Sequence, residues 1–238
     1  MTSHRIVHPF HALRAAVVAI TAAAAVLSGP APGASAEPCP DVEAVFARGT
    51  SEPPGVGGVG QAFVDALRAR VGDRSLAVYP VNYPASSDFS AGVEFAATVV
   101  EGIRDAANHV EATAANCPNT KIVLGGFSQG AAVAGFTTSA VVPEGVPAAF
   151  VPPPMPPEVA NHVAAVVLFG KPSDQWLRDA GAPTVVIGPL YVPKTIDLCA
   201  DGDTICNGAP LGGPTVAHAS YGFNGMVNQA ADFAASRL

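Results

Sequence analysis

The strongest constraint on the fold is an alternation, along most of the chain, between short apolar runs and longer segments of helical periodicity. Residues 163–169 are apolar throughout, which is typical of a strand covered on both faces. Residues 93–114 instead repeat apolar side chains every three or four positions, as one face of a helix does. Strands that alternate with helices predict crossover connections, and these place the strands parallel in one sheet.

The same patterns give the order of the remaining elements. Further strands are predicted at 42–47, 76–81 and 122–124, further extended segments at 184–187 and 195–198, and further helices at 62–71, 131–140 and within 216–238. The proline-rich stretch 141–159 has neither period, so we expect an ordered surface loop there. The predicted fold class is therefore α/β, with a central, mostly parallel sheet and helices on both faces.

The composition is that of a globular chain with few charges. Of 238 residues, 49% are hydrophobic and 13% charged, and the formal net charge is -7. This apolar content is enough for a sizeable packed core. With 12 Lys plus Arg against 19 Asp plus Glu, the chain has no cationic surplus to neutralise phosphates, so no nucleic-acid partner is expected. No repeat or linker divides the sequence, and one domain is predicted.

The first 36 residues have the pattern of a secretory signal peptide. Arg5 and Arg14 precede the uncharged stretch 15–27, and a group of small residues ends the segment. The apolar stretch is too short to span a bilayer, so no transmembrane segment is expected. We expect residues 1–36 to be removed and residues 37–238 to form the mature domain, a monomer that is secreted or associated with the cell envelope.

The cysteines of the mature chain are Cys39, Cys117, Cys199 and Cys206. An even number in an exported chain predicts disulfides, and no pair of Cys-x-x-Cys motifs offers the spacing of a zinc site. The short span between Cys199 and Cys206 makes their pairing the favoured one, which leaves Cys39 with Cys117. In the chain-entropy description, the long loop would contribute roughly 4 kcal/mol and the short one roughly 2 to 3 kcal/mol.

One pentapeptide carries a chemical signature. Residues 126–130 read Gly-Phe-Ser-Gln-Gly, which matches G-x-S-x-G, with Ser128 at its centre. This motif requires a sharp turn from a strand to a helix, with glycines that allow the two to approach closely. An apolar run precedes the pentapeptide and a small-residue helix is predicted after it, so Ser128 is a candidate nucleophile.

A serine hydroxyl needs a base, and three histidines remain in the mature chain. His109 falls nearly opposite the apolar stripe of its predicted helix, so we expect it on the solvated surface. His162 precedes a strand, whereas sites in open α/β sheets lie beyond the carboxyl ends of the strands. His218 follows the last predicted strand, in a loop rich in glycine, and is the candidate base.

The acid that orients the base should lie between the serine and the histidine in the chain. The eligible aspartates are Asp174, Asp179, Asp197, Asp201 and Asp203. Two of them, Asp201 and Asp203, lie inside the predicted disulfide loop just past a strand end. The residues alone do not decide between these two.

From about Cys39 to the C-terminus, the chain resembles the cutinase family of secreted serine esterases, in particular its actinobacterial cutinase-like branch. The residues that carry this resemblance are Arg48, Gly49, Thr50, Ser51 and Glu52 after the first strand, Gly126 to Gly130, then Cys199, Gly202, Asp203 and Cys206, and finally His218 with Tyr221. Together these are far more specific than the pentapeptide alone.

The resemblance implies a role for each matching position. Ser128 is the implied nucleophile, His218 the general base and Asp203 the acid that orients it. The amides of Thr50 and Gln129 are the implied oxyanion hole, with a contribution from the Thr50 hydroxyl. For Gln129 the donor is the main chain, so its side chain is expected to matter little. The family pairs the cysteines as the loop argument does, and implies no metal or other cofactor.

The implied activity is hydrolysis of carboxylic esters through an acyl-enzyme, on short to medium acyl esters or a cutin-type polyester. An acetyl-xylan or phospholipid esterase with the same three residues is the alternative, and a non-enzymatic secreted scaffold is a more distant one. The proline-rich loop, with Phe150, Val151 and Met155, is expected either to form an apolar rim for an acyl chain or simply to cover the surface.

Overall fold

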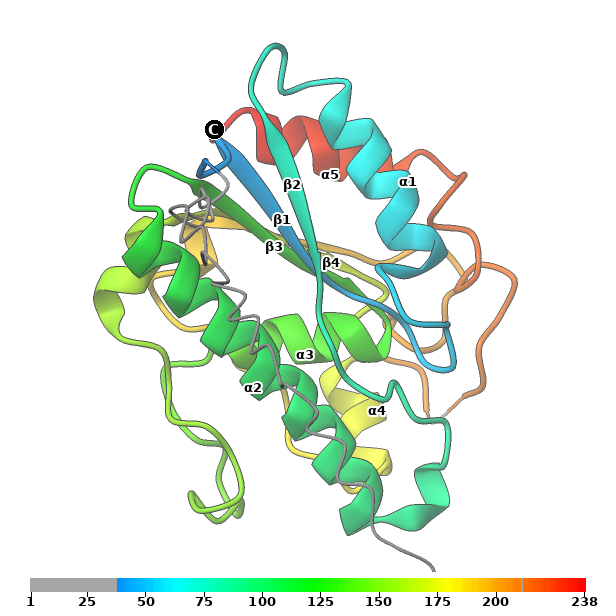
Figure 1. Cartoon of the computed structure of the whole chain (residues 1–238). Coiled ribbons are helices and arrows are strands. Elements are labelled where there is room, and N and C mark those ends of the chain that lie inside the picture. Colours follow the sequence, from blue (N-terminus) through cyan, green and yellow to red (C-terminus); the bar gives the residue numbers. More distant parts are fainter. Residues whose placement is uncertain (1–37, 211) are drawn as a thin grey trace, which may run out of the picture. The chain divides into compact units, whose positions relative to one another are not determined.

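Five parallel strands form a single sheet in the computed structural model, which describes residues 38–210 and 212–238 (Figure 1). The predicted signal peptide lies outside the described residues. The strands are β1 (Val42–Ala47), β2 (Leu76–Pro80), β3 (Lys121–Phe127), β4 (Val163–Phe169) and β5 (Thr195–Leu198), and their order across the sheet is β2-β1-β3-β4-β5. Every neighbouring pair is parallel, as the alternating pattern predicts.

Helices cover both faces of this sheet. They are α1 (Gly57–Arg68), α2 (Val93–Asn116), α3 (Gln129–Thr137), α4 (Asp174–Asp179) and α5 (Met226–Ala235). Helices α1 and α5 pack together on one face, and α2 and α3 pack together on the other (Figure 1). The fold is therefore a single α/β domain of three layers.

Strand β1 shows how the sequence fills both layers of the core. All six of its residues are buried. Val42, Ala44 and Phe46 belong to the apolar cluster beneath α1 and α5, whereas Val45 and Ala47 belong to the cluster beneath α2 and α3. Because successive side chains of a strand point to opposite faces, a central strand is buried along its whole length, and β1 is apolar apart from Glu43.

Helix α1 begins at Gly57, five residues earlier than the predicted start at residue 62. The Glu52 carboxylate explains the difference, because it accepts hydrogen bonds from the main-chain N–H of Gly49 at 2.6 Å and of Gly58 at 2.7 Å. A carboxylate at this position satisfies a donor that the helix itself leaves unpaired and complements the positive end of the helix dipole. The cap thus comes from outside the local sequence pattern.

The region between β4 and β5 also departs from the prediction. Residues 184–187 join no strand of the sheet, and instead the Ser139 hydroxyl holds this segment by donating to the Val186 carbonyl at 2.6 Å. Helix α4 was not predicted. It begins after Ser173, whose hydroxyl accepts a hydrogen bond from the Trp176 N–H at 3.1 Å, and this N-cap is the sequence signal that locates it.

The proline-rich stretch contains no strand and only a short 3-10 turn, Pro157–Asn161, at its end. It connects the end of α3 with the start of β4, so it lies at the edge where strands begin, away from their carboxyl ends (Figure 1). Met155 is buried in the core layer beneath α2 and α3, whereas Phe150 is 67% exposed. Both ends of the loop are therefore attached at the amino edge of the sheet.

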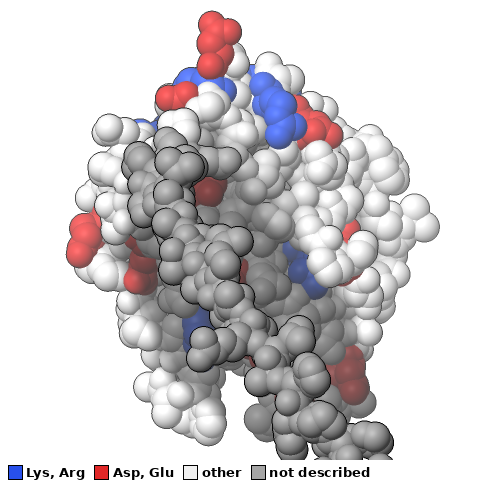
Figure 2. Space-filling model, in the orientation of Figure 1, with Lys and Arg blue, Asp and Glu red and all other residues white. Residues whose placement is uncertain are grey.

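Charged side chains are sparse on the face shown in Figure 2, and the two signs lie close to each other there. This distribution agrees with the low content of charged residues. Of the helices in the described part of the chain, none combines the length and the apolar character needed to cross a bilayer.

The turn from β3 into α3 depends on two glycines. A Cβ on Gly126 would collide with the main chain of Gly130, and a Cβ on Gly130 would collide with the main-chain oxygens of Ala47 and Arg48. None of these obstacles is a flexible side chain. The first turn of α3 therefore lies directly against the end of β1, and only glycine allows this approach.

We predict that Gly130→Ala lowers the free energy of unfolding by roughly 1 to 3 kcal/mol, because the added methyl group overpacks a site bounded by main chain. Urea unfolding measures this change. Gly213→Ala is the matched control, because a Cβ there meets nothing within 4 Å, and its effect should stay within about 0.5 kcal/mol. Equal stability of the two variants would contradict the account of the turn.

Candidate active site

Ser128 lies at the sharp turn between β3 and α3, at the carboxyl edge of the sheet. Its φ of 55° and ψ of -118° put a non-glycine residue in a rarely populated region of backbone conformation. Two contacts hold this turn: the Ser128 N–H donates to the Phe169 carbonyl at 2.8 Å, and the Ser128 carbonyl accepts from the Ala131 N–H at 2.9 Å. The side chain consequently projects away from the sheet, at the start of α3.

His218 reaches this serine from the loop before α5. Its Nε2 lies 2.9 Å from Ser128 Oγ, and its Nδ1 lies 2.8 Å from Asp203 Oδ2. Because an ionised carboxylate only accepts hydrogen bonds, Nδ1 carries the proton and Nε2 is the acceptor for the serine hydroxyl. The His218 residue is 6% exposed, so the imidazole faces the serine with little access for water.

Asp203 is the aspartate that the fold places beside the histidine. It is 0% exposed, and its Oδ1 accepts a hydrogen bond from the Ile205 N–H at 3.0 Å. Asp201 is exposed, and the other eligible aspartates lie in α4 and β5. The Tyr221 hydroxyl is a further donor to Asp203. The sequence identified Tyr221 only as part of the family resemblance and gave its hydroxyl no role.

The two other histidines of the mature chain lie elsewhere. His162 directly precedes β4, at the amino edge of the sheet, as its place in the sequence indicates. The prediction that His109 lies on the solvated surface is wrong. Its Nε2 is 2.9 Å from Glu43 Oε1 on β1, and its ring stacks on Tyr79 of β2 with centroids 3.4 Å apart. The buried Glu43 draws the histidine toward the sheet, because a buried carboxylate requires polar partners.

The loop that carries Thr50 is anchored by the buried Arg48. The guanidinium donates from Nε to the Glu52 carbonyl at 2.8 Å and from Nη2 to the Tyr83 carbonyl at 2.5 Å. In return, the Tyr83 hydroxyl donates to the Arg48 carbonyl at 2.5 Å. Arg48 therefore holds the loop.

One short segment after β2 contacts both sides of the serine turn. The Ala85 carbonyl accepts from the Ser51 N–H at 2.8 Å, next to Thr50 in the chain. The next carbonyl, that of Ser86, accepts from Gln129 Nε2 at 3.0 Å. The Gln129 side chain is buried and links the start of α3 to this segment, a structural contact that the sequence did not indicate.

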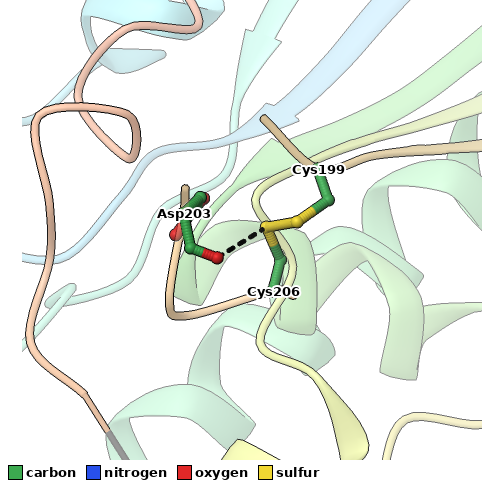
Figure 3. A group of neighbouring side chains, drawn as sticks. All are labelled: Cys199, Asp203 and Cys206. Atoms are coloured by element: carbon green, nitrogen blue, oxygen red, sulfur yellow. Dashed lines mark hydrogen bonds between the residues drawn. A yellow bond between two sulfur atoms is a disulfide. The ribbon is translucent and has the colours of Figure 1, made fainter. Parts of the chain in front are cut away.

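The disulfides join Cys39 to Cys117 and Cys199 to Cys206, which are the pairings favoured above. Figure 3 shows the second one directly beside Asp203, with the Cys206 sulfur 3.7 Å from the Asp203 carbonyl oxygen. The two sulfurs and the carboxylate form a compact group, but the sulfurs are bonded to each other. They are therefore not thiolates, and the group is not a metal site.

Comparison with known families gives a single clear match. The profile of the family described as Cutinase covers residues 38–238, which is the whole domain. Similar curated proteins of Mycobacterium tuberculosis include the carboxylesterase Culp1, 48% identical over 97% of both chains, and the probable carboxylesterase Culp7, 61% identical over 71% of this chain and 89% of the relative. The phospholipase Culp4 of the same organism is 45% identical over 95% of this chain and 92% of its own.

Solved structures with a similar fold include a cutinase and an acetyl xylan esterase. A Trichoderma reesei cutinase in complex with a phosphonate inhibitor superimposes with a TM-score of 0.61 at 32% identity, over 84% of this chain and 77% of that chain. An acetyl xylan esterase superimposes with a TM-score of 0.63 at 26% identity, over 84% of this chain and 99% of that chain.

We predict that the two disulfides differ in what they support. Replacing Cys199 and Cys206 together by Ser should strongly lower kcat for p-nitrophenyl butyrate and leave the melting temperature close to that of the parent. The reason is that this short loop holds Asp203 and little of the core. Replacing Cys39 and Cys117 together is the control. It opens a loop worth roughly 4 kcal/mol in the chain-entropy description and should mainly cost stability. Proportional losses in both variants would contradict this division.

Proposed function

The chain belongs to the cutinase family and is a carboxylic ester hydrolase, and we propose that it is a secreted serine esterase that works through Ser128, His218 and Asp203. The observation that carries this proposal is the continuous series of hydrogen-bonding contacts among the three side chains, 2.9 Å from Ser128 Oγ to His218 Nε2 and 2.8 Å from His218 Nδ1 to Asp203. These are the distances that proton transfer from a hydroxyl to an imidazole requires.

In the proposed first step, His218 Nε2 takes the hydroxyl proton as Ser128 Oγ attacks the ester carbonyl carbon. Asp203 keeps the imidazole in the tautomer that can accept this proton and stabilises the imidazolium that forms. His218 then gives the proton to the oxygen of the leaving alcohol, and an acyl-enzyme on Ser128 remains. A water molecule, deprotonated by the same Nε2, attacks this ester, and His218 returns the proton to Ser128 Oγ as the acid leaves.

The negative charge on the carbonyl oxygen of the substrate needs fixed donors. We assign this role to the main-chain N–H groups of Thr50 and Gln129, with the Thr50 hydroxyl as a further donor. Gln129 is the first residue of α3, where the helix provides no acceptor for the N–H and where its dipole favours an anion. The contacts of Ser51 and Gln129 with the 85–86 segment support a fixed spacing of these donors.

For the substrate we propose short to medium acyl esters, with cutin-type polyesters included. Val216 and Phe223 flank His218 along the chain and are 86% and 79% exposed, so apolar side chains are available to an acyl group near the base. The 45% identity to a phospholipase favours a lipid ester as the second candidate, with acetylated xylan as a third. A panel of p-nitrophenyl esters, phospholipids and acetyl-xylan, compared by kcat/KM, distinguishes these substrates.

We also propose that the enzyme acts outside the cell. Two disulfides in a chain of this kind support an oxidising compartment. Expression of the full chain with export should give a mature protein whose N-terminal sequence begins at Glu37, because the small residues before this position fit a signal-peptidase site. An exported protein that retains its first 36 residues would contradict this proposal.

The nucleophile has a direct test. Ser128→Ala should lower kcat for p-nitrophenyl butyrate by roughly a million-fold, as loss of a serine nucleophile does in other hydrolases, while the melting temperature stays close to that of the parent. Labelling by a fluorophosphonate should be lost in parallel. Ser236→Ala, at an exposed position after α5, is the control and should keep full activity. Undiminished turnover in Ser128→Ala would rule out this nucleophile.

A further inference from the structure

The Tyr221 hydroxyl lies in the interior, between Asp203 and the Cys199–Cys206 disulfide. Tyr221 is 0% exposed. Its oxygen accepts a hydrogen bond from the Ala200 N–H at 3.0 Å and lies 2.6 Å from Asp203 Oδ2. Since the amide can only donate and the carboxylate only accepts, the phenolic hydrogen points to Asp203. Tyr221 is among the residues that carry the family resemblance, but neither the resemblance nor the proposed mechanism gives its hydroxyl a role.

The Asp203 carboxylate depends on a small set of donors. The Ile205 N–H serves Oδ1, while His218 Nδ1–H and the Tyr221 hydroxyl both serve Oδ2. A carboxylate that is 0% exposed has to obtain its stabilisation from such donors, because burial of an uncompensated charge is costly. The Tyr221 hydroxyl therefore stabilises negative charge on Asp203 Oδ2, the same oxygen that accepts the hydrogen bond from His218.

The surroundings leave little room for water to replace this hydroxyl. Gly170, at a φ of +56°, lies against the group, and a Cβ there would come within 2.9 Å of Tyr221 and 3.1 Å of both Asp203 and His218. The Tyr221 ring also meets the His218 ring edge-on, with centroids 6.3 Å apart. The phenol, the carboxylate and the imidazole thus form one closely packed unit.

Tyr221 also stays protonated at neutral pH and for some distance above it. Burial raises the pKa of the Tyr221 hydroxyl above its ordinary value, and the hydrogen bond to Asp203 raises this pKa further. The hydroxyl is consequently a permanent donor and takes no part in proton transfer. It does not touch Ser128, so any effect on the reaction has to pass through Asp203.

We propose that Tyr221 is a positioning residue of the esterase, which fixes Asp203 Oδ2 in front of His218 and sets how strongly this carboxylate stabilises the imidazolium. The inference rests on the proposed function, since it assumes that Asp203 orients the base. It adds a fourth side chain to the three proposed above and assigns it two effects, on geometry and on the basicity of His218.

Tyr221→Phe is the direct test, because it keeps the ring and removes only the hydroxyl. We expect kcat for p-nitrophenyl butyrate to fall roughly 10-fold, the usual worth of a hydrogen bond to a charged group, with KM unchanged. The acid limb of the pH profile of kcat/KM should move to higher pH. The reason is that Asp203, no longer shared, stabilises the imidazolium more strongly and so raises the pKa of His218.

Tyr191→Phe is the matched control. Tyr191 is 6% exposed, but within the described residues its hydroxyl has no hydrogen-bond partner. Its removal should leave both kcat and the pH profile unchanged. If Tyr221→Phe loses melting temperature and activity in proportion, with an unmoved acid limb, then the hydroxyl only stabilises the fold and the proposal is wrong.

A double-variant cycle separates this proposal from the proposed function. In an Asp203→Ala background, Tyr221→Phe should cause no further loss of kcat, because the two residues act through one carboxylate. An additive loss would overturn the inference. Full activity in Ser128→Ala would overturn the proposed function instead, whereas an inactive Ser128→Ala with an unaltered Tyr221→Phe would overturn only the role of Tyr221.

A second substitution covers the case in which Tyr221→Phe does not fold. Incorporation of 3-fluorotyrosine at position 221 keeps the hydroxyl and makes it a stronger donor, since fluorine lowers the pKa of a phenol. It should draw more charge from Asp203 and move the acid limb of kcat/KM to lower pH, opposite to Tyr221→Phe. An unmoved limb would contradict the proposal.

Discussion

The close approach of the first turn of α3 to the end of β1 is the constraint on which the rest of the site depends. Gly126 and Gly130 permit it, and no larger residue fits at either position without moving main chain. The approach forces the intervening Ser128 into a strained backbone conformation. The same turn places Ser128 directly before Gln129, the first residue of α3. One packing contact thereby positions both the proposed nucleophile and one of the donors proposed for the oxyanion.

Backbone strain in this molecule is concentrated around that turn. Within the described residues, Ser51, Ala85 and Ser128 are the non-glycine positions with positive φ. Ser51 and Ala85 are joined by a main-chain hydrogen bond, and the residue after Ala85 accepts from the side chain of Gln129. Strain of this kind persists only where the surroundings determine the backbone, and here hydrogen bonds that join two loops and the start of α3 do so. The donors assigned to the oxyanion are thus fixed before a substrate arrives.

Much of the fold could be predicted from the sequence, because buried parallel strands leave a simple signature. The limits of β1 and β4 follow directly from their largely apolar runs, and β5 coincides with a predicted extended segment. The start of α1 could not be found in this way, since its cap is Glu52, which lies outside the helical pattern. The prediction that His109 lies on the surface was wrong for a related reason. The helical stripe counts apolar residues only, whereas the histidine is held by Glu43 on a strand far away in the sequence.

In the candidate site too, local sequence patterns predict some residues, whereas others depend on tertiary contacts. Chain order and elimination lead to Ser128 and His218, but they leave Asp201 and Asp203 equal, because both follow a strand end inside one short loop. What separates them is burial. Asp203 points inward, where three donors from two segments meet it, and one of these donors is Tyr221, eighteen residues further along. A buried carboxylate is stable only when such donors are complete, so its identity is a property of the assembled loops and not of the pattern around it.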